Sequence, residues 1–578
     1  MARAARRRVA LWALLPMAAA TTAVAADLPA PLLGRIRTAI ERAERDGAAM
    51  PIEGMRSFVF MEAGIARAAI GDREAARRDL ERALREARSI PVPSLRATIF
   101  GGIGAGLARA GDRDGAGRAF GAAYEAARGI TAPSERCVQL ATIAADQAES
   151  GGLGLARLEM AEAGRVARSI PPPARPGRPA RWRAIQALIV QQLRAGFADD
   201  ALRTAAETGV FAADPLGLTE AIEPQRVRIK PADRRRLLDW ARDHADEAGD
   251  AGKVVLSWVA INLADLGDFD AALATTRAVD DGDGPALDRV LLAWTLAGIA
   301  EHRALTGDRA AALALLDERV RPLSERVGEP GLRPRSQLLL AVARARARAG
   351  DLEGAAAVVD SFGPPPADEP PGAGVVVLRL PGPAADPNAP LRASYEIARA
   401  RAMTYLAAGQ VAAGRAEAAR RGLSRAFEIV KDAFDEAPVE ARRAMQEIAE
   451  IRAEAGAVED ATAAAIYVGH STEMGAYVPG LIRPEQIAAL CAVARARAQQ
   501  NDIEGARRAA DLAPKAVRPM VLSTIAQDLA RHGAPFQAVR LADSIDEATH
   551  RAGTLDLVVR EIERLEAAAK RPKGRPKP

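Results

Sequence analysis

The sequence predicts an all-α protein, folded as an α-α superhelix (solenoid) of about eleven helix-turn-helix units. Gly71, Gly111 and Gly151 lie 40 residues apart, and each opens a short turn between two alanine-rich runs with helical periodicity. A fixed period of this length is typical of stacked helix pairs, in which each unit buries its apolar face only against its neighbours. No run of alternating β-branched residues is long enough for a sheet, and the aromatic content of 4% suits closely packed helices.

Each repeat is recognised by the residue that opens its turn. These residues are Gly71, Gly111, Gly151, Gly196, Gly267, Gly307, Gly350, Gly414, Gly456, Asn501 and Gly533. Alanine stands five residues after the turn in every repeat, a small residue stands seven before it in all but one, and a large apolar residue stands eleven before it. Two helices that cross closely need a small residue at the contact, and the large residue one turn earlier fills the space beside it.

The chemistry of the turn also indicates where each helix ends and begins. Glycine or asparagine accepts the left-handed backbone conformation that ends the first helix. In several repeats an aspartate follows directly, where its carboxylate is placed to cap the second helix. These aspartates are Asp72, Asp112, Asp268, Asp308, Asp351 and Asp502. We interpret them as helix caps and assign them no catalytic role.

This pattern resembles the tetratricopeptide repeat over about Arg56 to Ile545: a small residue, a Gly-Asp turn seven residues later and an alanine five further on. The regular spacings here are 40–45 residues, longer than the roughly 34 of that family, and the family's aromatic positions are mostly aliphatic. The chain is thus similar to a divergent relative with long helices. The resemblance implies a concave groove, lined by the first helix of each repeat, that binds a protein or an extended peptide.

Composition divides the chain into five segments. We expect a signal peptide at 1–25, helical repeats at 26–362, a Pro/Gly-rich loop or linker at 363–392, further repeats with a closing helix at 393–569, and a basic disordered tail at 570–578. Residues 30–46 and Glu547–Lys570 read as helices that cap the two ends of the array. Longer intervals predict an extra helix around Asp233–Ala248 and an insertion at Tyr467–Pro484.

The N-terminal segment has the three parts of an export signal. Arg3, Arg6, Arg7 and Arg8 precede an apolar stretch from Val9 to about Ala20, and Ala23-Val24-Ala25 offers small residues for cleavage before Ala26. We therefore expect the protein in the periplasm of a bacterium. The alternative is an uncleaved N-terminus that anchors the chain in the inner membrane.

The net charge of +5 comes from the ends of the chain. The four N-terminal arginines and the five basic residues of the tail together carry more positive charge than the net charge of the whole chain. The rest of the chain is therefore slightly acidic. A nucleic-acid-binding protein would cluster basic residues on one folded face, and we expect no nucleic-acid partner. The tail offers at most a weak contact with an anionic membrane or polymer, or is simply a solvated terminus. Cys137 and Cys491 fall on apolar helix faces, which predicts two buried free thiols.

A search for catalytic and metal-binding motifs predicts no cofactor and no metal site. The five histidines are scattered, and the sequence contains neither a Gly-x-Ser-x-Gly elbow nor a phosphate-binding loop. The glycines of Gly101–Gly106 lie inside a predicted helix with no preceding strand, so they do not indicate a dinucleotide site. Asp280, Asp281 and Asp283 have the wrong spacing for a calcium loop.

The remaining candidate site is the groove. If the positions six and thirteen before the turn face it, the N-terminal half offers an apolar trough and the C-terminal half a polar one with arginines able to hold a peptide carboxylate. The candidate partner-binding residues are Ile65, Val190, Ile261, Arg183, Arg344, Arg401, Arg443 and Arg495. The alternative is that these arginines are ordinary solvated residues of a helix face.

These observations favour a periplasmic repeat protein that serves as a protein–protein interaction scaffold or adaptor without catalysis. The alternative, from another class, is a cell-envelope enzyme or accessory subunit acting on cell-wall or polysaccharide substrates. A third reading is a membrane-surface protein held by its tail or N-terminus.

Overall fold

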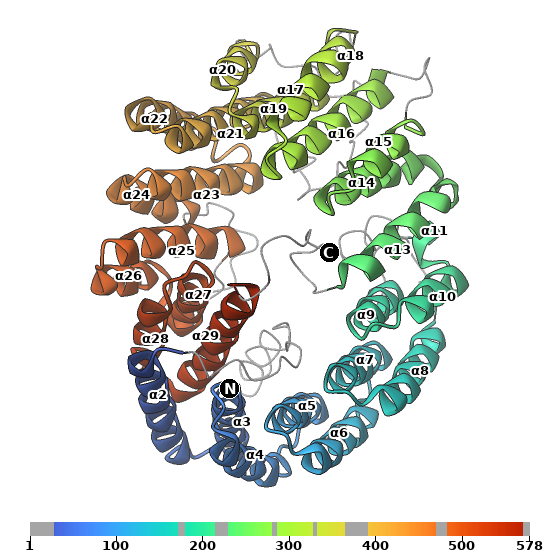
Figure 1. The fold of residues 1–578 in the computed structure, drawn as a ribbon, viewed down its shortest axis with the longest axis vertical. Coiled ribbons are helices and arrows are strands. Elements are labelled where there is room, and N and C mark those ends of the chain that lie inside the picture. The colour runs from blue at the N-terminus through green and yellow to red at the C-terminus, as the bar shows by residue number, and fades with distance from the viewer. Residues whose placement is uncertain are drawn as a thin grey trace. The chain divides into compact units, whose positions relative to one another are not determined.

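The computed structural model describes residues 28–171, 180–213, 229–279, 286–326, 332–363, 391–469 and 483–569. Within these ranges every regular element is a helix, which confirms the all-α class (Figure 1). The expected signal peptide, the tail, most of the 363–392 segment, Asp280–Asp283 and residues 470–482 of the predicted insertion lie outside the described residues.

Eleven consecutive helix pairs correspond to the eleven predicted repeats. They are α3 (Glu53–Ala69) with α4 (Arg73–Ala87), α5 (Pro93–Arg109) with α6 (Arg113–Arg128), α7 (Pro133–Glu149) with α8 (Leu153–Ser169), α9 (Ala180–Arg194) with α10 (Ala198–Thr208), α14 (Gly252–Asp265) with α15 (Phe269–Thr276), α16 (Ala286–Leu305) with α17 (Arg309–Leu315), α19 (Leu332–Ala349) with α20 (Leu352–Asp360), α21 (Leu391–Ala412) with α22 (Ala416–Asp432), α23 (Pro438–Glu454) with α24 (Val458–Gly469), α25 (Pro484–Gln499) with α26 (Ile503–Ala509), and α27 (Arg518–Arg531) with α28 (Pro535–Asp543). First helices of successive repeats pack side by side from α3 to α9 and from α14 to α25, so in each of these two runs the first and second helices form two layers.

The other helices lie between or beyond the repeats. They are α2 (Ala30–Ala48), α11 (Val210–Ala213), α13 (Pro231–Asp243), α18 (Arg321–Arg326), α29 (Ala548–Ala569), short 3₁₀ segments at Ala245–Ala251, Ala510–Leu512 and Lys515–Val517, and a π segment at Leu316–Val320. Helix α13 confirms the extra helix predicted in the interval that follows the fourth repeat.

The helices group into two compact modules. Module 1 comprises Met1–Arg234 and Pro519–Pro578, and module 2 comprises Arg235–Arg518. Module 1 thus contains both ends of the described chain. The division predicted at 363–392 stays a prediction, because residues 364–390 lie outside the described residues.

The turn chemistry is confirmed in detail. All eleven turn residues have positive φ, between 64° at Asn501 and 94° at Gly151 and Gly307, a conformation that glycine adopts at no steric cost. Five of the six predicted aspartates cap the second helix. Asp112 shows the pattern: its carboxylate accepts a hydrogen bond of 2.9 Å from the Gly115 N–H. The exception is Asp72, which makes no capping bond and instead accepts a 3.2 Å hydrogen bond from Arg67.

The small residue seven before the turn lies where the two helices of a repeat cross. A Cβ placed on Gly64 would lie 2.6 Å from Leu80 Cγ, and one on Gly104 would lie 2.9 Å from the Phe120 ring. A large buried side chain of the second helix therefore fills the space that the small residue leaves open. Cys137 and Cys491 are buried and free, as predicted, and burial raises the pKa of Cys137 to about 12.

Helices α2 and α29 correct one expectation. They were expected to cap opposite ends of the array, but they pack on each other and both contact α3 (Figure 1). Helix α29 begins like a first helix: Arg551 donates a 2.6 Å hydrogen bond to the Ile545 carbonyl, as Arg96 does to the Ile90 carbonyl at the start of α5. With α29 as first helix and α2 as second, the two form a twelfth helix pair, called here the composite repeat.

The close crossing within a repeat predicts opposite effects for two glycines of the same repeat. Gly104→Ala should lower the free energy of unfolding by about 1–3 kcal/mol, because its methyl group has no room beside Phe120. Gly117→Ala, on the exposed side of α6, meets no atom within 4 Å and should stabilise the helix by up to about 1 kcal/mol. Urea denaturation of both variants measures this. Equal effects would contradict the packing argument.

The composite repeat predicts a local effect of Arg551. This side chain is fully buried and pairs with Asp46 of α2 as well as with the Ile545 carbonyl. Replacing it by methionine should leave the buried Ile545 carbonyl without its donor and the half-exposed Asp46 without its ion pair, at a cost of about 1–3 kcal/mol. Hydrogen exchange should then accelerate in both α2 and α29. The control is Arg42→Met, because Arg42 makes a half-exposed 3.4 Å pair with Asp543 worth at most about 1 kcal/mol. Acceleration in α29 alone would show that α2 is not part of this repeat.

Candidate functional site

A row of charged and polar side chains runs along five successive first helices of module 2. It lies on α16, α19, α21, α23 and α25, which pack side by side in that order. We call it the charged ladder. Its members are Glu301, Arg344, Arg401, Tyr405, Arg443, Gln446, Glu447, Glu450 and Arg495. They occupy the positions thirteen, ten, nine and six before the turn, which share one face of a helix.

The centre of the ladder is Glu447 on α23. Arg401 of α21 binds it through two hydrogen bonds, of 2.8 Å from Nε and 2.6 Å from Nη2, the bidentate geometry that fixes a carboxylate most strongly. The Tyr405 hydroxyl donates a third bond of 3.0 Å. Arg443 approaches the same carboxylate more loosely, at 3.6 Å. One carboxylate therefore holds two arginines and a tyrosine in place.

The ladder continues on both sides of this centre. Towards α16, Arg344 lies 2.7 Å from Glu301 and its guanidinium stands 5.6 Å from the centre of the Tyr405 ring. Towards α25, Gln446 donates a 3.0 Å hydrogen bond to Glu450. The positive charge of Arg495 on α25 also stabilises the ionised form of the Glu450 carboxyl. Charged side chains of neighbouring repeats thus contact each other across helix boundaries, with an arginine and a glutamate paired between α16 and α19 and between α21 and α23.

Burial and neighbouring charge set the ionisation of the two central carboxyls. Burial alone would raise the pKa of Glu447, but the guanidinium of Arg401 and its hydrogen bonds hold that pKa below its usual range. Burial raises the pKa of Glu450, and the charge of Glu447 adds to the effect. Glu447 is therefore the fixed anion of the ladder at neutral pH.

The ladder carries an excess of positive charge. Four guanidinium groups face three carboxylates. Among the arginines in the ladder's ion pairs Arg443 is the most exposed, with 38% of its side chain accessible, and within the described residues it has only the 3.6 Å contact to Glu447. A ligand carboxylate can therefore reach Arg443 without first displacing a tight internal pair.

Four of the five arginines predicted from sequence belong to this ladder. They are Arg344, Arg401, Arg443 and Arg495. The fifth, Arg183, is exposed on α9 of module 1, so it does not join the others in one module. Arg344, Arg401 and Arg443 do not stand alone on this face, because each pairs with a carboxylate of the same ladder.

The predicted apolar residues do not form an open trough. Ile65 and Val190 are only 3% and 7% exposed. A Cβ on Gly106 of α5 would lie 2.9 Å from Ile65 Cγ1, and one on Gly298 of α16 would lie 3.1 Å from Ile261 Cδ1. Ile65 and Ile261 thus pack against the next first helix, because close spacing of the first-helix layer leaves their side chains no other space.

Sequence reasoning missed Tyr405 and Glu447. Both stand nine residues before their turn, between the positions six and thirteen that predicted the arginines. The spacing offered a signal, because Tyr405 and Glu447 each follow a predicted arginine, Arg401 and Arg443, by four residues. Side chains four apart lie on the same helix face.

Module 1 contains its own polar cluster on the first-helix layer, but this one is buried. Arg109 of α5 contacts Glu563 of α29 at 2.7 Å, with only 8% and 4% of the two side chains exposed. Next to this pair, Asp556 contacts Arg560 at 2.5 Å and shares a hydrogen bond with Glu62 of α3. These contacts hold the composite repeat to α3 and α5. We therefore assign them a structural role.

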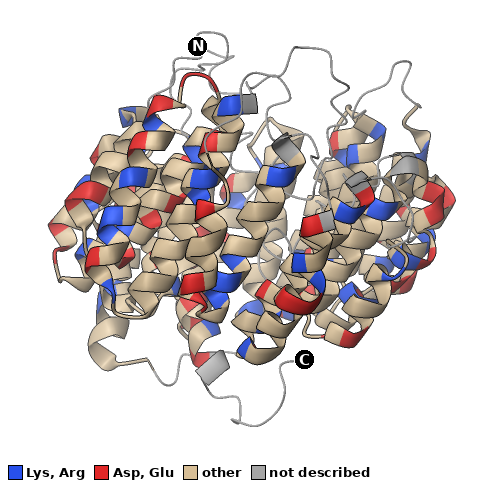
Figure 2. Cartoon of the chain, turned by 90° about the horizontal axis from the view of Figure 1, so that it is seen from above, with Lys and Arg blue, Asp and Glu red and all other residues tan. Residues whose placement is uncertain are grey.

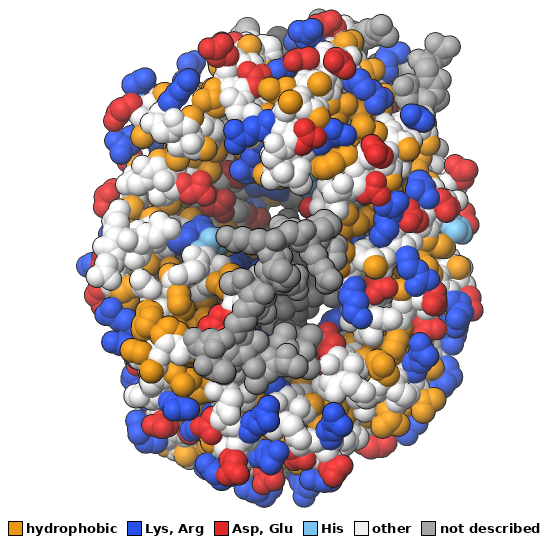
Figure 3. All heavy atoms as spheres, in the orientation of Figure 1, with side chains coloured by type: hydrophobic (Ala, Val, Ile, Leu, Met, Phe, Trp, Pro, Cys, Tyr) orange, Lys and Arg blue, Asp and Glu red, His pale blue; other side chains and the backbone are white. Residues whose placement is uncertain are grey.

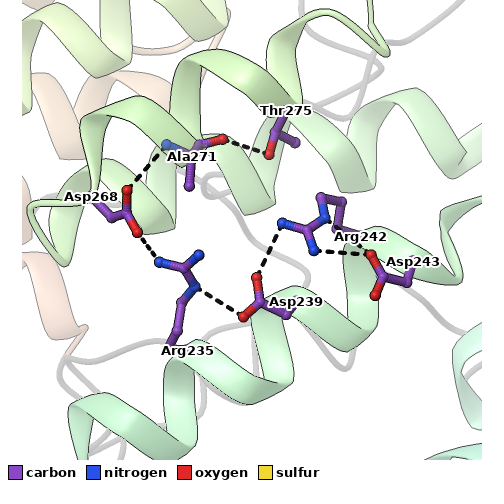
Figure 4. Close-up of polar contacts among 7 residues, drawn as sticks. All are labelled: Arg235, Asp239, Arg242, Asp243, Asp268, Ala271 and Thr275. Carbon is purple, nitrogen blue, oxygen red and sulfur yellow. Dashed lines mark hydrogen bonds and ion pairs between the residues drawn. The ribbon is translucent and has the colours of Figure 1, made fainter.

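A third polar cluster anchors the inserted helix α13 (Figure 4). Arg235 pairs with Asp268 at the start of α15 and contacts Asp239 at 3.0 Å. Arg242 contacts Asp239 at 3.1 Å and Asp243 at 3.0 Å. Asp268 also accepts the capping hydrogen bond of α15, of 3.1 Å from the Ala271 N–H. The Asp268 carboxylate therefore both caps α15 and holds the inserted helix α13 in place through Arg235.

The described residues show basic and acidic side chains interspersed over the helices and over the surface (Figures 2 and 3). Within the described ranges, no group of three or more His, Cys, Asp or Glu side chains is arranged to hold a metal ion. In the same part of the chain, the helices include none with the length and apolar character needed to span a membrane.

Comparisons with known proteins yield only distant likenesses. No family model matches the sequence, and no curated protein matches it either. Among solved structures, Ton1535 from Thermococcus onnurineus NA1 shares 15% identity, covers 72% of this chain and 99% of its own, and has a TM-score of 0.27. A circular tandem repeat protein with novel repeat topology and enhanced subunit contact surfaces shares 15% identity, covers 93% and 99%, and has a TM-score of 0.16. At TM-scores this low, neither structure is a basis for inferring the fold or the function of this chain.

The buried cluster of module 1 predicts a pH-dependent stability. Burial raises the pKa of Glu62, and the neighbouring Asp556 carboxylate raises it further; burial raises the pKa of Glu563 to about 7. A carboxyl whose pKa is raised in the folded protein keeps its proton over a pH range in which the unfolded chain, with a pKa near 4.3, has already released it. The contribution of these two carboxyls to stability is therefore fully present below that pH and is lost as the pH rises through 7, by up to about 1.4 kcal/mol per pH unit for one proton.

Glu62→Gln should flatten this decline, because its amide still donates to Asp556 but cannot ionise. The measurement is the free energy of unfolding from pH 5 to 9 for both proteins. The control, Glu125→Gln, removes an exposed carboxyl and should leave the slope unchanged. A slope that is the same in wild type and Glu62→Gln would show that Glu62 does not hold a proton in the folded state.

Proposed function

We propose that this chain is an exported adaptor of tetratricopeptide-like type, without catalysis of its own, that binds a protein segment along the charged ladder of module 2. The single observation that carries the proposal is the ladder itself. It joins side chains from five successive repeats on one face of the first-helix layer, the layer that the tetratricopeptide resemblance implies for ligand binding. The export signal expected at residues 1–25 supports a periplasmic location.

The chemistry of the ladder supports an extended, carboxylate-bearing ligand. Arginine pairs with carboxylates through two parallel hydrogen bonds, and these are among the strongest polar contacts in proteins. The excess guanidinium and the loose 3.6 Å contact of Arg443 leave donor capacity for one ligand carboxylate. Glu301 and Glu450 offer acceptors on either side, so a segment of mixed charge fits the ladder better than a purely acidic one.

Preorganisation supports the same assignment. Arg401 is held by two hydrogen bonds to Glu447, and Tyr405 is fixed by a third. Side chains that are already ordered lose little conformational entropy when a ligand binds. The ladder is therefore suited to recognise a segment along several repeats rather than to perform chemistry on it.

The test is selection of binding peptides from a random display library with the mature protein, followed by titration of the selected peptides. Peptides that carry a carboxylate should be enriched. The variant with Arg344→Ala, Arg443→Ala and Arg495→Ala should bind them at least about tenfold more weakly, since a hydrogen bond to a charged group contributes about 1.5–3 kcal/mol. The matched control replaces Arg420, Arg507 and Arg508, on the second helices α22 and α26, and should bind normally.

The corresponding lysine variant separates binding from folding. It keeps the charges opposite Glu301, Glu447 and Glu450 but loses the bidentate geometry of arginine. It should melt like the wild type and still bind weakly. Selected peptides that bind equally to all variants would refute the proposed site, and turnover of a cell-wall or polysaccharide substrate by the purified protein would refute the adaptor assignment.

A further inference from the structure

The boundary between the composite repeat and the first repeat, here called the joint, contains a small apolar cluster. Helices α2 and α29 both pack on α3, and the cluster that joins the three helices consists of Ala43, Val59, Ala548 and Ala552, with Met50 packed against it. Hydrophobic stabilisation grows with the apolar area that is buried, and three alanines and a valine bury little. The polar contacts of the joint therefore contribute to how firmly the composite repeat is held.

Two carboxyl pairs cross the joint, one in each helix layer. In the first-helix layer, Glu62 of α3 shares a hydrogen bond with Asp556 of α29. In the second-helix layer, Asp79 of α4 shares one with Glu44 of α2. Two ionised carboxylates are both acceptors, so a hydrogen bond between them needs a proton on one of the two groups. Each of these contacts therefore exists only while the pair holds a proton.

In the first pair, the carboxyls outnumber the guanidiniums. Arg560 of α29 contacts Asp556 at 2.5 Å, and its charge also acts on Glu62. Arg109 of α5 lies close by but pairs with Glu563 at 2.7 Å, so it supplies no spare positive charge. Burial and the Asp556 carboxylate raise the pKa of Glu62 to about 8. This pair therefore holds its proton at neutral pH.

The second pair has the same balance of charge. Arg67 of α3 donates two hydrogen bonds to Glu44, of 2.8 and 2.9 Å, and lies 2.9 Å from Asp79. It also contacts Asp72 at 3.2 Å, and the charge of Arg78 acts on Asp79 as well. Burial and the Glu44 carboxyl raise the pKa of Asp79 to about 8. In each place three carboxyls thus face two guanidiniums, and a proton neutralises the carboxyl left over.

The opposite boundary of the composite repeat is held differently. Towards α27, Arg531 contacts Glu561 of α29 at 3.2 Å, and towards α28, Arg42 of α2 contacts Asp543 at 3.4 Å. Pairs of opposite charge need no added proton at neutral pH. A rise in pH therefore weakens the joint with the first repeat and leaves the contacts with α27 and α28 in place.

We propose that the joint is a proton-dependent latch: the composite repeat stays docked on α3 and α4 while each carboxyl pair shares a proton, and it detaches when the protons are lost. Once ionised, the two carboxylates of a pair repel each other in buried surroundings. Detachment moves both pairs into water, where carboxyl groups ionise near pH 4. The contribution of the two pairs to docking is therefore complete below about pH 4, and it is lost as the pH rises through about 8.

The experiment is hydrogen exchange of the full chain at pH 5, 6 and 7, read by mass spectrometry and corrected for the intrinsic effect of pH on exchange. The opening constant of α2 and α29 should rise by up to about a hundredfold per pH unit, because each of two protons released on opening contributes a factor of about ten. Helices α5 to α8, which belong to the same module but lie outside the joint, should change much less.

Amide variants test whether the two pairs hold these protons. Glu62→Gln combined with Asp79→Asn should make the opening of α2 and α29 independent of pH, since each amide donates to its partner carboxylate without titrating. Either substitution alone should leave a dependence of about tenfold per pH unit. The matched control, Glu53→Gln with Glu81→Gln, removes exposed carboxyls from the same two helices and should behave like the wild type.

Two outcomes would overturn the proposal. The first is the same pH dependence in α2, α29 and α5 to α8, which would show that module 1 opens as a whole and has no separate latch. The second is a dependence in the amide variants equal to that of the wild type, which would show that the two pairs hold no proton. Should the double variant fail to fold, the two single variants decide by the same slope.

Discussion

The close crossing of two helices within each repeat is the constraint on which the rest of the structure depends. A helix pair of this size cannot bury its apolar surface alone, so it packs tightly inside the repeat and on both neighbours. Gly64 and Gly104 show how tight the crossing is, because a single methyl group would collide with Leu80 or Phe120. An alanine-rich sequence follows from this spacing, and so does the scarcity of aromatic side chains.

This constraint also explains the composite repeat. A terminal repeat in a stack leaves one apolar face uncovered, and solenoids usually cover it with a polar capping helix. Here α29 supplies the first helix of a pair and α2 the second, so each covers the face that the other would leave exposed. Arg551 is placed where the two meet, and full burial of a guanidinium is acceptable there because Asp46 and the Ile545 carbonyl both accept from it.

How far the sequence predicted the structure depended on how local each interaction is. The turn glycines, the aspartate caps and the small crossing residues act over a few positions, and the period of the chain displays them. Asp72 makes no capping bond, although Arg67 holds its carboxylate from five residues earlier as Arg497 holds that of the cap Asp502, and nothing in the structure explains the difference. The start of α29 had a local signal, since Ile545 and Arg551 repeat the spacing of Ile90 and Arg96. Its partner α2 had none, because Arg551 and Asp46 are 505 residues apart.

The candidate site, too, was predictable only where its residues are fixed by local sequence position. Position in the repeat placed four arginines on one face, but it did not reveal that Glu447 binds Arg401 and contacts Arg443, because which side chains meet across a helix boundary depends on the rotation and spacing of neighbouring helices. The apolar trough failed for the same reason: Ile65 is on the expected helix, yet the next helix lies close enough to cover it.

Comparing the two modules shows why the ladder rather than the other ion pairs is the candidate site. Both modules place charges on the first-helix layer, so the position alone does not distinguish them. In module 1 the pair of Arg109 and Glu563 is almost fully buried and joins helices from opposite ends of the chain, a contact that a ligand cannot enter without separating α29 from α5. In module 2 both signs of charge run along neighbouring repeats, one guanidinium is in excess, and Arg443 keeps 38% of its side chain accessible. Charged groups buried between helices hold a fold together, whereas partly exposed groups held in place by one another remain available to a partner.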